Sequence, residues 1–117
     1  MKRTAVLNVV GLTQRHIGPD TPAISKFLSL GQAALIDPAF PAVTCTAQSN
    51  YLTGKRPSGH GIVGNGWYNH ELAEVTFWKQ PNHTVQSPKL WHDLRRANSD
   101  FTCASMFWGF NMYADVE

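Results

Sequence analysis

Ala5-Val6-Leu7-Asn8-Val9-Val10 forms an almost continuous apolar run, and Gly11 closes it. An apolar run without polar alternation is typical of a β-strand that is covered on both faces, as in a parallel sheet flanked by helices. We therefore expect a buried strand over residues 5–10. This stretch favours an α/β fold.

Two further elements follow this strand. Thr21 is a favourable N-cap residue, and Pro22 suits the first helical position, where the missing N–H loses no bond. Apolar residues then recur at helical spacing, and Gly31 is placed to end the helix. We expect a helix that opens at Pro22 and closes at Gly31, and then a short strand from Ala33 to Ile36.

The middle of the chain predicts a second helix, over residues 45–53. Thr44 would be its N-cap and Gly54 its C-cap. Residues 55–87 are rich in glycine and proline and are expected to form loops. A short strand over residues 75–77 is the exception.

The last part of the chain predicts one more helix and one more strand. Ser87-Pro88 repeats the pattern of a cap residue before proline, so we expect the third helix to open there. Arg95 and Arg96 would end this helix, because cations suit the negative end of a helix dipole. Residues 101–106 are expected to form a buried strand.

Strands that alternate with helices predict an α/β fold: a partial, doubly wound, mostly parallel sheet with helices on both faces. No internal repeat or linker divides the sequence, so residues 1–117 are expected to belong to a single domain. A doubly wound sheet needs more strands than these. We therefore expect the amino-terminal part of a larger domain, with an exposed sheet edge through which the chain could associate with itself.

Composition excludes several classes of protein. The 10 Lys and Arg against 8 Asp and Glu give a net charge of +2, without a block of either sign, which excludes a nucleic-acid binder that relies on a basic field. Only 15% of the residues are charged, against roughly 25% in an average domain, so part of the surface is expected to be covered. No apolar run approaches the about 18 residues that cross a membrane. Without a signal-peptide cleavage site or a disulfide pattern, a cytoplasmic location is expected.

Several chemical motifs do not predict a site. Gly59-His60-Gly61-Ile62-Val63-Gly64 matches G-x-G-x-x-G, but it neither follows a predicted strand nor opens a helix, as a dinucleotide site requires. Gly54-Lys55 lacks the other residues of a phosphate-binding loop. The five histidines have no zinc-binding spacing. Asn82-His83-Thr84 is a glycosylation sequon, which matters only in a secreted protein.

Two residues at the start of the second helix have candidate chemistry. Cys45 could be a nucleophile at a helix N-terminus, or it could be a small packed residue; Tyr51 stands where a tyrosine phosphatase needs its arginine. The Thr44 hydroxyl could cap the helix, or it could point at an anion held by the first free N–H groups. A divalent metal can make such a hydroxyl nucleophilic. Position alone leaves both alternatives open.

Two motifs carry a resemblance to a known family. The first is Pro38-Ala39-Phe40-Pro41-Ala42-Val43-Thr44, and the second runs Leu52-Thr53-Gly54-Lys55-Arg56-Pro57-Ser58-Gly59-His60-Gly61-Ile62-Val63-Gly64-Asn65. They fit the patterns P-x-F-P-x-x-T and T-G-x-x-P-x-x-H-G-I-x-x-N without a gap. Weaker similarity continues at Thr21-Pro22 and at Phe107-Trp108-Gly109. The sequence resembles the nucleotide pyrophosphatase/phosphodiesterase family of the alkaline phosphatase superfamily.

The resemblance implies a phosphohydrolase with an alkaline phosphatase-like core. Thr44 would attack phosphorus and form a covalent intermediate that water then hydrolyses. Two divalent metal ions, expected to be zinc, would activate the Thr44 hydroxyl, which would itself be a metal ligand. Asn65 and the backbone N–H of Cys45 would stabilise charge on the phosphate oxygens. His60 and Gly61 would shape the loop that presents Asn65.

The sequence departs from the family at two places. Val10 stands where the family has a metal-binding Asp, with Asn8 and Thr13 as weaker substitutes. Ala47-Gln48 stands where many members have Asn-His. The other metal ligands of the family come from beyond position 117, so residues 1–117 alone are expected to be inactive.

The expected substrate is a phosphoester or a nucleotide-like small molecule, with no nucleic-acid polymer and no membrane as a partner. Two alternatives stay open. A phosphomonoesterase or phosphonate hydrolase could use the same scaffold, because nothing in these residues reads the leaving group. A non-catalytic relative that binds phosphate or a nucleotide is the other, because the missing Asp could cost the site a metal.

Overall fold

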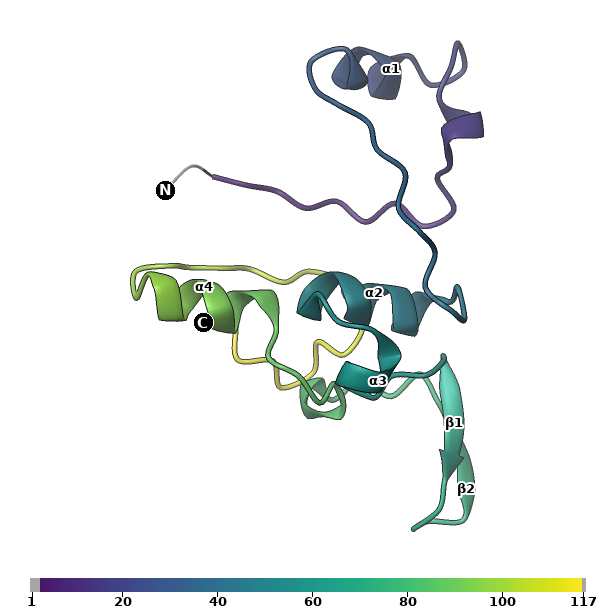
Figure 1. The fold of residues 1–117 in the computed structure, drawn as a ribbon, viewed down its shortest axis with the longest axis vertical. Coiled ribbons are helices and arrows are strands. Elements are labelled where there is room, and N and C mark those ends of the chain that lie inside the picture. The colour runs from purple at the N-terminus through teal and green to yellow at the C-terminus, as the bar shows by residue number, and fades with distance from the viewer. Residues whose placement is uncertain (1–2, 117) are drawn as a thin grey trace. The chain divides into compact units, whose positions relative to one another are not determined.

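The computed structural model describes residues 3–116 and separates two compact units, Met1–Asp37 and Pro38–Glu117. The first unit holds a 3₁₀ turn, Gln14–His16, and helix α1, Pro22–Leu28. The second unit holds three helices, α2 (Thr44–Thr53), α3 (Pro57–His60) and α4 (Leu90–Ala97) (Figure 1). It also holds strands β1 (Gly66–Asn69) and β2 (Glu74–Phe77) and a second 3₁₀ turn, Asn82–Thr84. None of the helices in the described part of the chain is long and apolar enough to cross a membrane.

Helix α1 begins at Pro22, as the sequence predicts, and ends at Leu28. Thr21 occupies the N-cap position, but its side chain does not cap the helix. The Thr21 hydroxyl donates to the carbonyl oxygen of His16 at 2.7 Å and accepts the N–H of Gly18 at 3.0 Å. Thr21 therefore closes the loop before α1.

The strands predicted over residues 5–10 and 33–36 are absent from this structure. Neither segment has regular secondary structure, and their apolar side chains are exposed; Leu7, for example, is 84% exposed. A strand needs a neighbour to pair its backbone N–H and C=O groups. Within residues 3–116 no such neighbour pairs with either segment, and for this reason the prediction fails here.

Helix α2 lies against the short helix α3 (Figure 1). Gly54 ends α2 with a left-handed φ of 65°, which confirms the predicted C-cap, and Gly61 ends α3 with a φ of 81°. Glycine suits both positions because it has no Cβ to clash. The start of α2 differs from the prediction: the N-cap is Val43, and Thr44 is the first residue of the helix.

Strands β1 and β2 form an antiparallel hairpin in which Trp67 pairs with Thr76 and Tyr68 with Val75. The strand predicted over residues 75–77 is confirmed. The mostly parallel sheet is not, because the sheet of the described residues has these two antiparallel strands. The strand predicted over residues 101–106 is also absent: this segment alternates between half-buried and exposed residues but has no paired neighbour.

A small hydrophobic core holds the second unit together. Cys45, Ile62, Val85 and Phe110 form it, and Trp67 packs against it half-buried. These residues come from α2, from the loop after α3, from the segment before α4 and from the carboxyl-terminal segment. The core therefore fixes the loop after α3 against the first turn of α2.

Helix α4 begins at Leu90, two residues after the predicted Ser87-Pro88 start. Lys89 is the N-cap, and its backbone N–H donates to Nδ1 of His92 at 2.8 Å. Ser87 is buried, and its hydroxyl donates to the carbonyl oxygen of Gly59 at 2.6 Å. The side chain that was expected to cap α4 instead attaches this segment to α3.

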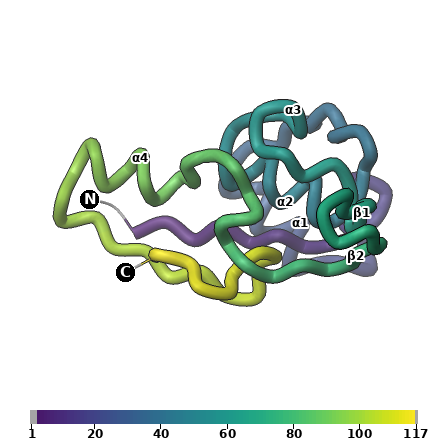
Figure 2. The backbone as a smooth tube through the Cα atoms, turned by 90° about the horizontal axis from the view of Figure 1, so that it is seen from below, coloured from purple at the N-terminus to yellow at the C-terminus, as the bar shows by residue number. Residues whose placement is uncertain are grey.

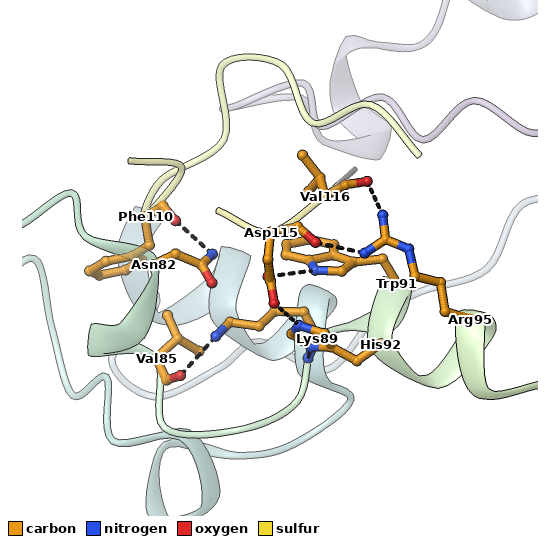
Figure 3. Close-up of polar contacts among 9 residues, drawn as sticks. All are labelled: Asn82, Val85, Lys89, Trp91, His92, Arg95, Phe110, Asp115 and Val116. Atoms are coloured by element: carbon orange, nitrogen blue, oxygen red, sulfur yellow. Dashed lines mark hydrogen bonds and ion pairs between the residues drawn. The ribbon is translucent and has the colours of Figure 1, made fainter. Parts of the chain in front are cut away.

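The residues that follow α4 in the chain fold back onto it (Figure 3). Asp115 accepts hydrogen bonds from Trp91 Nε1 at 3.2 Å and, at 2.8 Å, from His92 Nε2. The Arg95 guanidinium donates to the backbone carbonyls of Asp115 and Val116. Arg95 thus bonds a neighbouring segment and not the last carbonyls of its own helix. Figure 2 shows α4 at the end of the second unit opposite the hairpin.

Candidate active site

Thr44 lies at the amino-terminal end of α2, and its side chain is half-buried. The hydroxyl does not cap the helix, because the N-cap is Val43 and no side-chain cap bond is present. It forms no hydrogen bond with any of residues 3–116. Of the two alternatives that the sequence leaves open for Thr44, capping is therefore excluded.

Asn65 lies beside this same helical turn. Its Oδ1 accepts the backbone N–H of Cys45 at 3.0 Å. Because a backbone N–H can only donate, the atom that faces Cys45 must be the oxygen, and this contact fixes the orientation of the amide. Asn65 Nδ2 is left to donate elsewhere. The carbonyl oxygen of Asn65 accepts the N–H of Trp78 at 2.9 Å, which ties the residue to the hairpin as well.

Cys45 has its thiol in the hydrophobic core. Burial raises the pKa of the Cys45 thiol, which disfavours the thiolate that a nucleophile requires. The structure therefore supports Cys45 as a packed core residue and not as a nucleophile. Its backbone N–H was expected to stabilise a phosphate oxygen, but in this structure it is occupied by Asn65.

His60 and Gly61 lead into the loop that ends at Asn65. The His60 ring is fully buried, with Nδ1 3.1 Å from the backbone N of Ile62 and Nε2 2.7 Å from the side-chain amide of Asn50. Gly61 adopts a positive φ, and a Cβ there would approach Gln86 to 3.2 Å. Both residues therefore constrain the backbone at the start of this loop, and their role in presenting Asn65 stays a prediction.

Gln48 is a buried residue on α2 whose role the sequence did not reveal. Its Oε1 accepts the backbone N–H of Gly109 at 2.7 Å, across 61 positions of the chain. A Cβ on Gly109 would come within 3.0 Å of that oxygen. The only signal in the sequence was that Ala47-Gln48 replaces the Asn-His of many family members, and this signal does not name a partner.

The described residues do not form a metal site by themselves. Among residues 3–116, no group of three or more His, Cys, Asp or Glu side chains lies close enough together to hold a metal ion. Thr44 offers one unbonded oxygen. Val10 offers no donor at the position of the family Asp, and the Thr13 hydroxyl lies 2.9 Å from Nδ1 of His16.

The glycosylation sequon at Asn82 has no accessible acceptor. Asn82 is buried, and its Nδ2 donates to the carbonyl oxygen of Phe110 at 2.9 Å (Figure 3). A glycan attached to this nitrogen would have to displace both the bond and the surrounding core. Asn82 is therefore a structural residue.

Comparisons with known proteins show the family to which the chain belongs. The family described as "Type I phosphodiesterase / nucleotide pyrophosphatase" matches residues 4–117, and the chain belongs to this family. Over 46 residues, 39% of the chain, it is 41% identical to "Alkaline phosphatase PafA" of Elizabethkingia meningoseptica, and the match covers only 8% of that protein. No solved structure matches the chain. The family implies an alkaline phosphatase-like fold and dependence on divalent metal ions.

Proposed function

We propose that the full-length protein hydrolyses phosphodiester or pyrophosphate bonds, with Thr44 as the nucleophile. The hydrogen bond between the Cys45 N–H and Asn65 Oδ1 is the observation that carries this proposal. It holds a side-chain amide with a free N–H₂ group beside a helical turn whose first hydroxyl is unbonded. A donor and a nucleophile are the two groups that attack on phosphorus needs from the protein.

The reaction would proceed through two displacements at phosphorus. In the first, Thr44 Oγ1 bonds to phosphorus and gives its proton to solvent, while the bond to the leaving-group oxygen breaks and that oxygen takes the electron pair. In the second, a water oxygen attacks the phosphothreonine and gives up a proton, the bond to Oγ1 breaks, and Oγ1 takes up a proton from solvent so that the hydroxyl is restored. Asn65 Nδ2 would donate to a non-bridging oxygen in both steps, where negative charge accumulates. The positive end of the α2 dipole favours the same charge.

Thr44 would also be a metal ligand. When bound, two divalent ions, proposed to be zinc, would lower the pKa of the hydroxyl and neutralise charge on the leaving oxygen. The unbonded state of the Thr44 hydroxyl supports this role. We propose that most of the other ligands lie beyond residue 117, as they do in the family.

The same proposal extends to the fold and the domain. Residues 1–117 would be the amino-terminal part of one catalytic domain, and the segments 5–10, 33–36 and 101–106 would join its doubly wound, mostly parallel sheet. Their apolar side chains, many of them exposed here, support this, because such side chains are buried in strands covered on both faces. Without further strands, an exposed sheet edge would favour self-association, which size-exclusion chromatography would detect.

The proposed substrate is a small phosphoester or nucleotide-like molecule, and no nucleic-acid polymer or membrane is required. The cytoplasmic location stays a prediction. The similarity to a protein named an alkaline phosphatase favours a second candidate, a phosphomonoesterase. Turnover of mono- and diester aryl phosphates at equal zinc concentration would separate the two activities. Fewer than two bound metal ions per chain, with no turnover of either ester, would instead favour a non-catalytic phosphate-binding relative.

The decisive test uses the full-length protein and substitutions at two threonines of α2. Thr44→Ala should lose nearly all diester turnover, and Thr44→Ser, which keeps a hydroxyl, should retain a measurable part. Thr53→Ala is the control, since Thr53 at the other end of α2 bonds only backbone groups of Ser49 and Lys55. Mass spectrometry of acid-quenched protein should find the phosphoryl group on Thr44. Undiminished turnover in Thr44→Ala would refute the assignment.

A further inference from the structure

A cavity of about 530 Å³ lies beside the β1–β2 hairpin in the second unit. Its lining comes from the start of the loop after α3, from the hairpin, and from the segment between the hairpin and α4. Neither Thr44 nor Asn65 lines it. The volume falls within the roughly 300–1,000 Å³ of small-molecule sites. The cavity is therefore a candidate binding site apart from the proposed phosphate chemistry.

Thr76 supplies a hydroxyl without a partner at this cavity. Its side chain lines the cavity and the residue is only 7% exposed, yet Oγ1 has no hydrogen-bond partner within residues 3–116. The hydroxyls of Thr46 and Ser49 are also buried without a partner, but neither residue lines this cavity. A buried hydroxyl without a bond costs free energy, so native structures rarely keep one. A ligand in the cavity would supply the missing bond.

Trp67 supplies an aromatic surface next to Thr76. The two residues are directly paired across the hairpin, so their side chains lie on the same face of the sheet. The indole packs against the hydrophobic core, yet it is only half-buried and lines the cavity. Tryptophan combines a flat apolar ring with one N–H donor. This wall of the cavity therefore suits a ligand that has both an apolar face and a polar edge.

The other polar side chains of the cavity do not select an ion. Lys79 and Glu71 supply one charge of each sign, and neither forms an ion pair within residues 3–116. With His83 neutral, the lining has no net charge. Gln86 adds an uncharged amide that lies against Gly61, since a Cβ on that glycine would approach Gln86 Oε1 to 3.2 Å. Donors and acceptors are thus mixed around the cavity.

These groups fit one class of small molecule. We propose that the cavity binds a neutral monosaccharide, independently of the proposed chemistry at Thr44. A sugar ring has a C–H face that can pack on the indole of Trp67, and each of its hydroxyls can both donate and accept. The hydroxyls can therefore bond to Lys79 and Glu71 together, and one of them completes the hydrogen bonding of Thr76.

The walls of the cavity are ordered without a ligand. The backbone N–H of Gln86 donates to the carbonyl oxygen of His60 at 2.9 Å, and that of Thr84 donates to Pro81 at 3.1 Å. Val85, between Thr84 and Gln86, is buried in the hydrophobic core. Binding therefore orders little additional backbone, which lowers its entropic cost.

Saturation-transfer NMR on the full-length protein tests the proposal. The probes are glucose, galactose, mannose and N-acetylglucosamine, and at least one of them should receive saturation from the protein. Inorganic phosphate should not displace the bound sugar, because phosphate is an anion and its proposed site is elsewhere. No transfer to any of the four sugars would overturn the proposal, and so would displacement of the sugar by phosphate.

Two tryptophan substitutions test the aromatic wall. Trp67→Leu removes the ring but keeps an apolar side chain against the core, and we expect affinity for the bound sugar to fall about tenfold or more. Trp78→Leu is the matched control, since Trp78 is 53% exposed and does not line the cavity. Its affinity should stay within about twofold of the unmodified protein. Equal losses in the two variants would contradict a role of Trp67 in binding.

Thr76→Val removes the hydroxyl and nearly keeps the shape of the side chain. Because Oγ1 bonds nothing in the free protein, the Tm should not fall, whereas affinity for the sugar should fall by about threefold or more. Thr46→Val is the control: it removes an equally unpartnered hydroxyl outside the cavity and should leave affinity unchanged. Unchanged affinity in Thr76→Val, or a lower Tm, would overturn the role of this hydroxyl in binding.

Thr44→Ala separates this proposal from the proposed function. Since Thr44 does not line the cavity, Thr44→Ala should bind the sugar as the unmodified protein does. Sugar binding together with full diester turnover in Thr44→Ala would refute the proposed function and leave the cavity assigned. No sugar binding, together with turnover that depends on Thr44, would overturn the cavity proposal and leave the proposed function in place.

Discussion

The backbone N–H of Cys45 donates to Oδ1 of Asn65 at 3.0 Å, and this bond places the Asn65 amide beside Thr44. Because Asn65 Oδ1 accepts this bond, Nδ2 is the amide atom that can donate to a ligand. In the proposed site an asparagine fits both roles, because its amide oxygen accepts from Cys45 and its amide nitrogen can donate to a phosphate oxygen. An aspartate could keep the bond to Cys45 but could not donate.

Substitution of Asn65 should therefore lower the rate through the lost donor. In the full-length protein we expect both Asn65→Asp and Asn65→Ala to lower kcat by about 10²–10³, as removal of one donor to a charged transition state does elsewhere. Asn65→Asp should be the slower of the two, because its carboxylate keeps the bond to Cys45 and also repels the phosphate. Steady-state kinetics with a diester substrate measures this.

Asn69 supplies the control for Asn65. It lies at the end of β1, and its Oδ1 accepts the N–H groups of Glu71 and Leu72 in the hairpin turn. Asn69→Ala removes a side-chain acceptor of backbone N–H groups, as Asn65→Ala does, but these N–H groups belong to the hairpin turn and not to α2. The kcat of Asn69→Ala should therefore stay within about twofold of that of the unmodified protein. Equal losses at Asn65 and Asn69 would show that Asn65 matters only for the shape of its loop.

Gln48 offers a prediction about stability. Gln48→Met keeps the length of the side chain but removes the acceptor of the Gly109 N–H, and we expect it to destabilise the protein by about 1–3 kcal/mol, the usual cost of an unsatisfied buried donor. Gln80→Met is the control: Gln80 is exposed, and its change should stay within about 0.5 kcal/mol. Urea unfolding of both variants measures the difference. A Gln48→Met variant as stable as Gln80→Met contradicts the prediction.

The helices could be predicted largely because their ends carry local signals. Pro22 at the start of α1 and Gly54 after α2 depend on backbone conformation, which neighbouring residues set. The cap residues themselves were less predictable. The hydroxyls of Thr21 and Ser87 donate to backbone carbonyls of other segments and do not cap the helices that follow them. Single-residue patterns do not show this competition between hydrogen-bond partners.

The strands and the contacts of the site depend on distant residues. Residues 5–10 have the pattern of a buried strand, but a strand exists only where another pairs with it. Thr44 and Asn65 could be named from a motif, whereas the bond from Cys45 to Asn65 could not, since it joins residues 20 positions apart. The replacement at Gln48 did not name its partner, because that partner is the backbone of Gly109, and any residue type has a backbone.

Gly66 follows Asn65 directly and should not tolerate a larger residue. A Cβ at this position would lie 2.4 Å from Cδ1 of Phe77 and 2.7 Å from the carbonyl oxygen of Thr76. Gly66→Ala must therefore displace β2, and we expect a loss of about 1–3 kcal/mol, as in overpacked sites generally. Gly31→Ala, where a Cβ meets nothing within 4 Å, is the control. Thermal unfolding measures both variants. A Tm of Gly66→Ala equal to that of Gly31→Ala would contradict the predicted destabilisation.

Asp115 should make the docking of the carboxyl-terminal segment sensitive to acid. The hydrogen bond from His92 is the main cause that lowers the pKa of Asp115 from its ordinary value of 3.8, and the bond from Trp91 adds to it. A carboxyl whose pKa is lower in the folded state stabilises the fold fully above 3.8, and this contribution disappears as the pH falls through the folded-state pKa. Asp115→Asn keeps a side-chain acceptor but has no charge to lose. Its Tm should therefore lie below that of the unmodified protein near neutral pH, and the gap should close as the pH falls through the folded-state pKa of Asp115. Asp100→Asn, at an exposed residue, should show no such gap. A gap for Asp115→Asn that stays constant from neutral to acid pH would show that its charge contributes nothing to the docking.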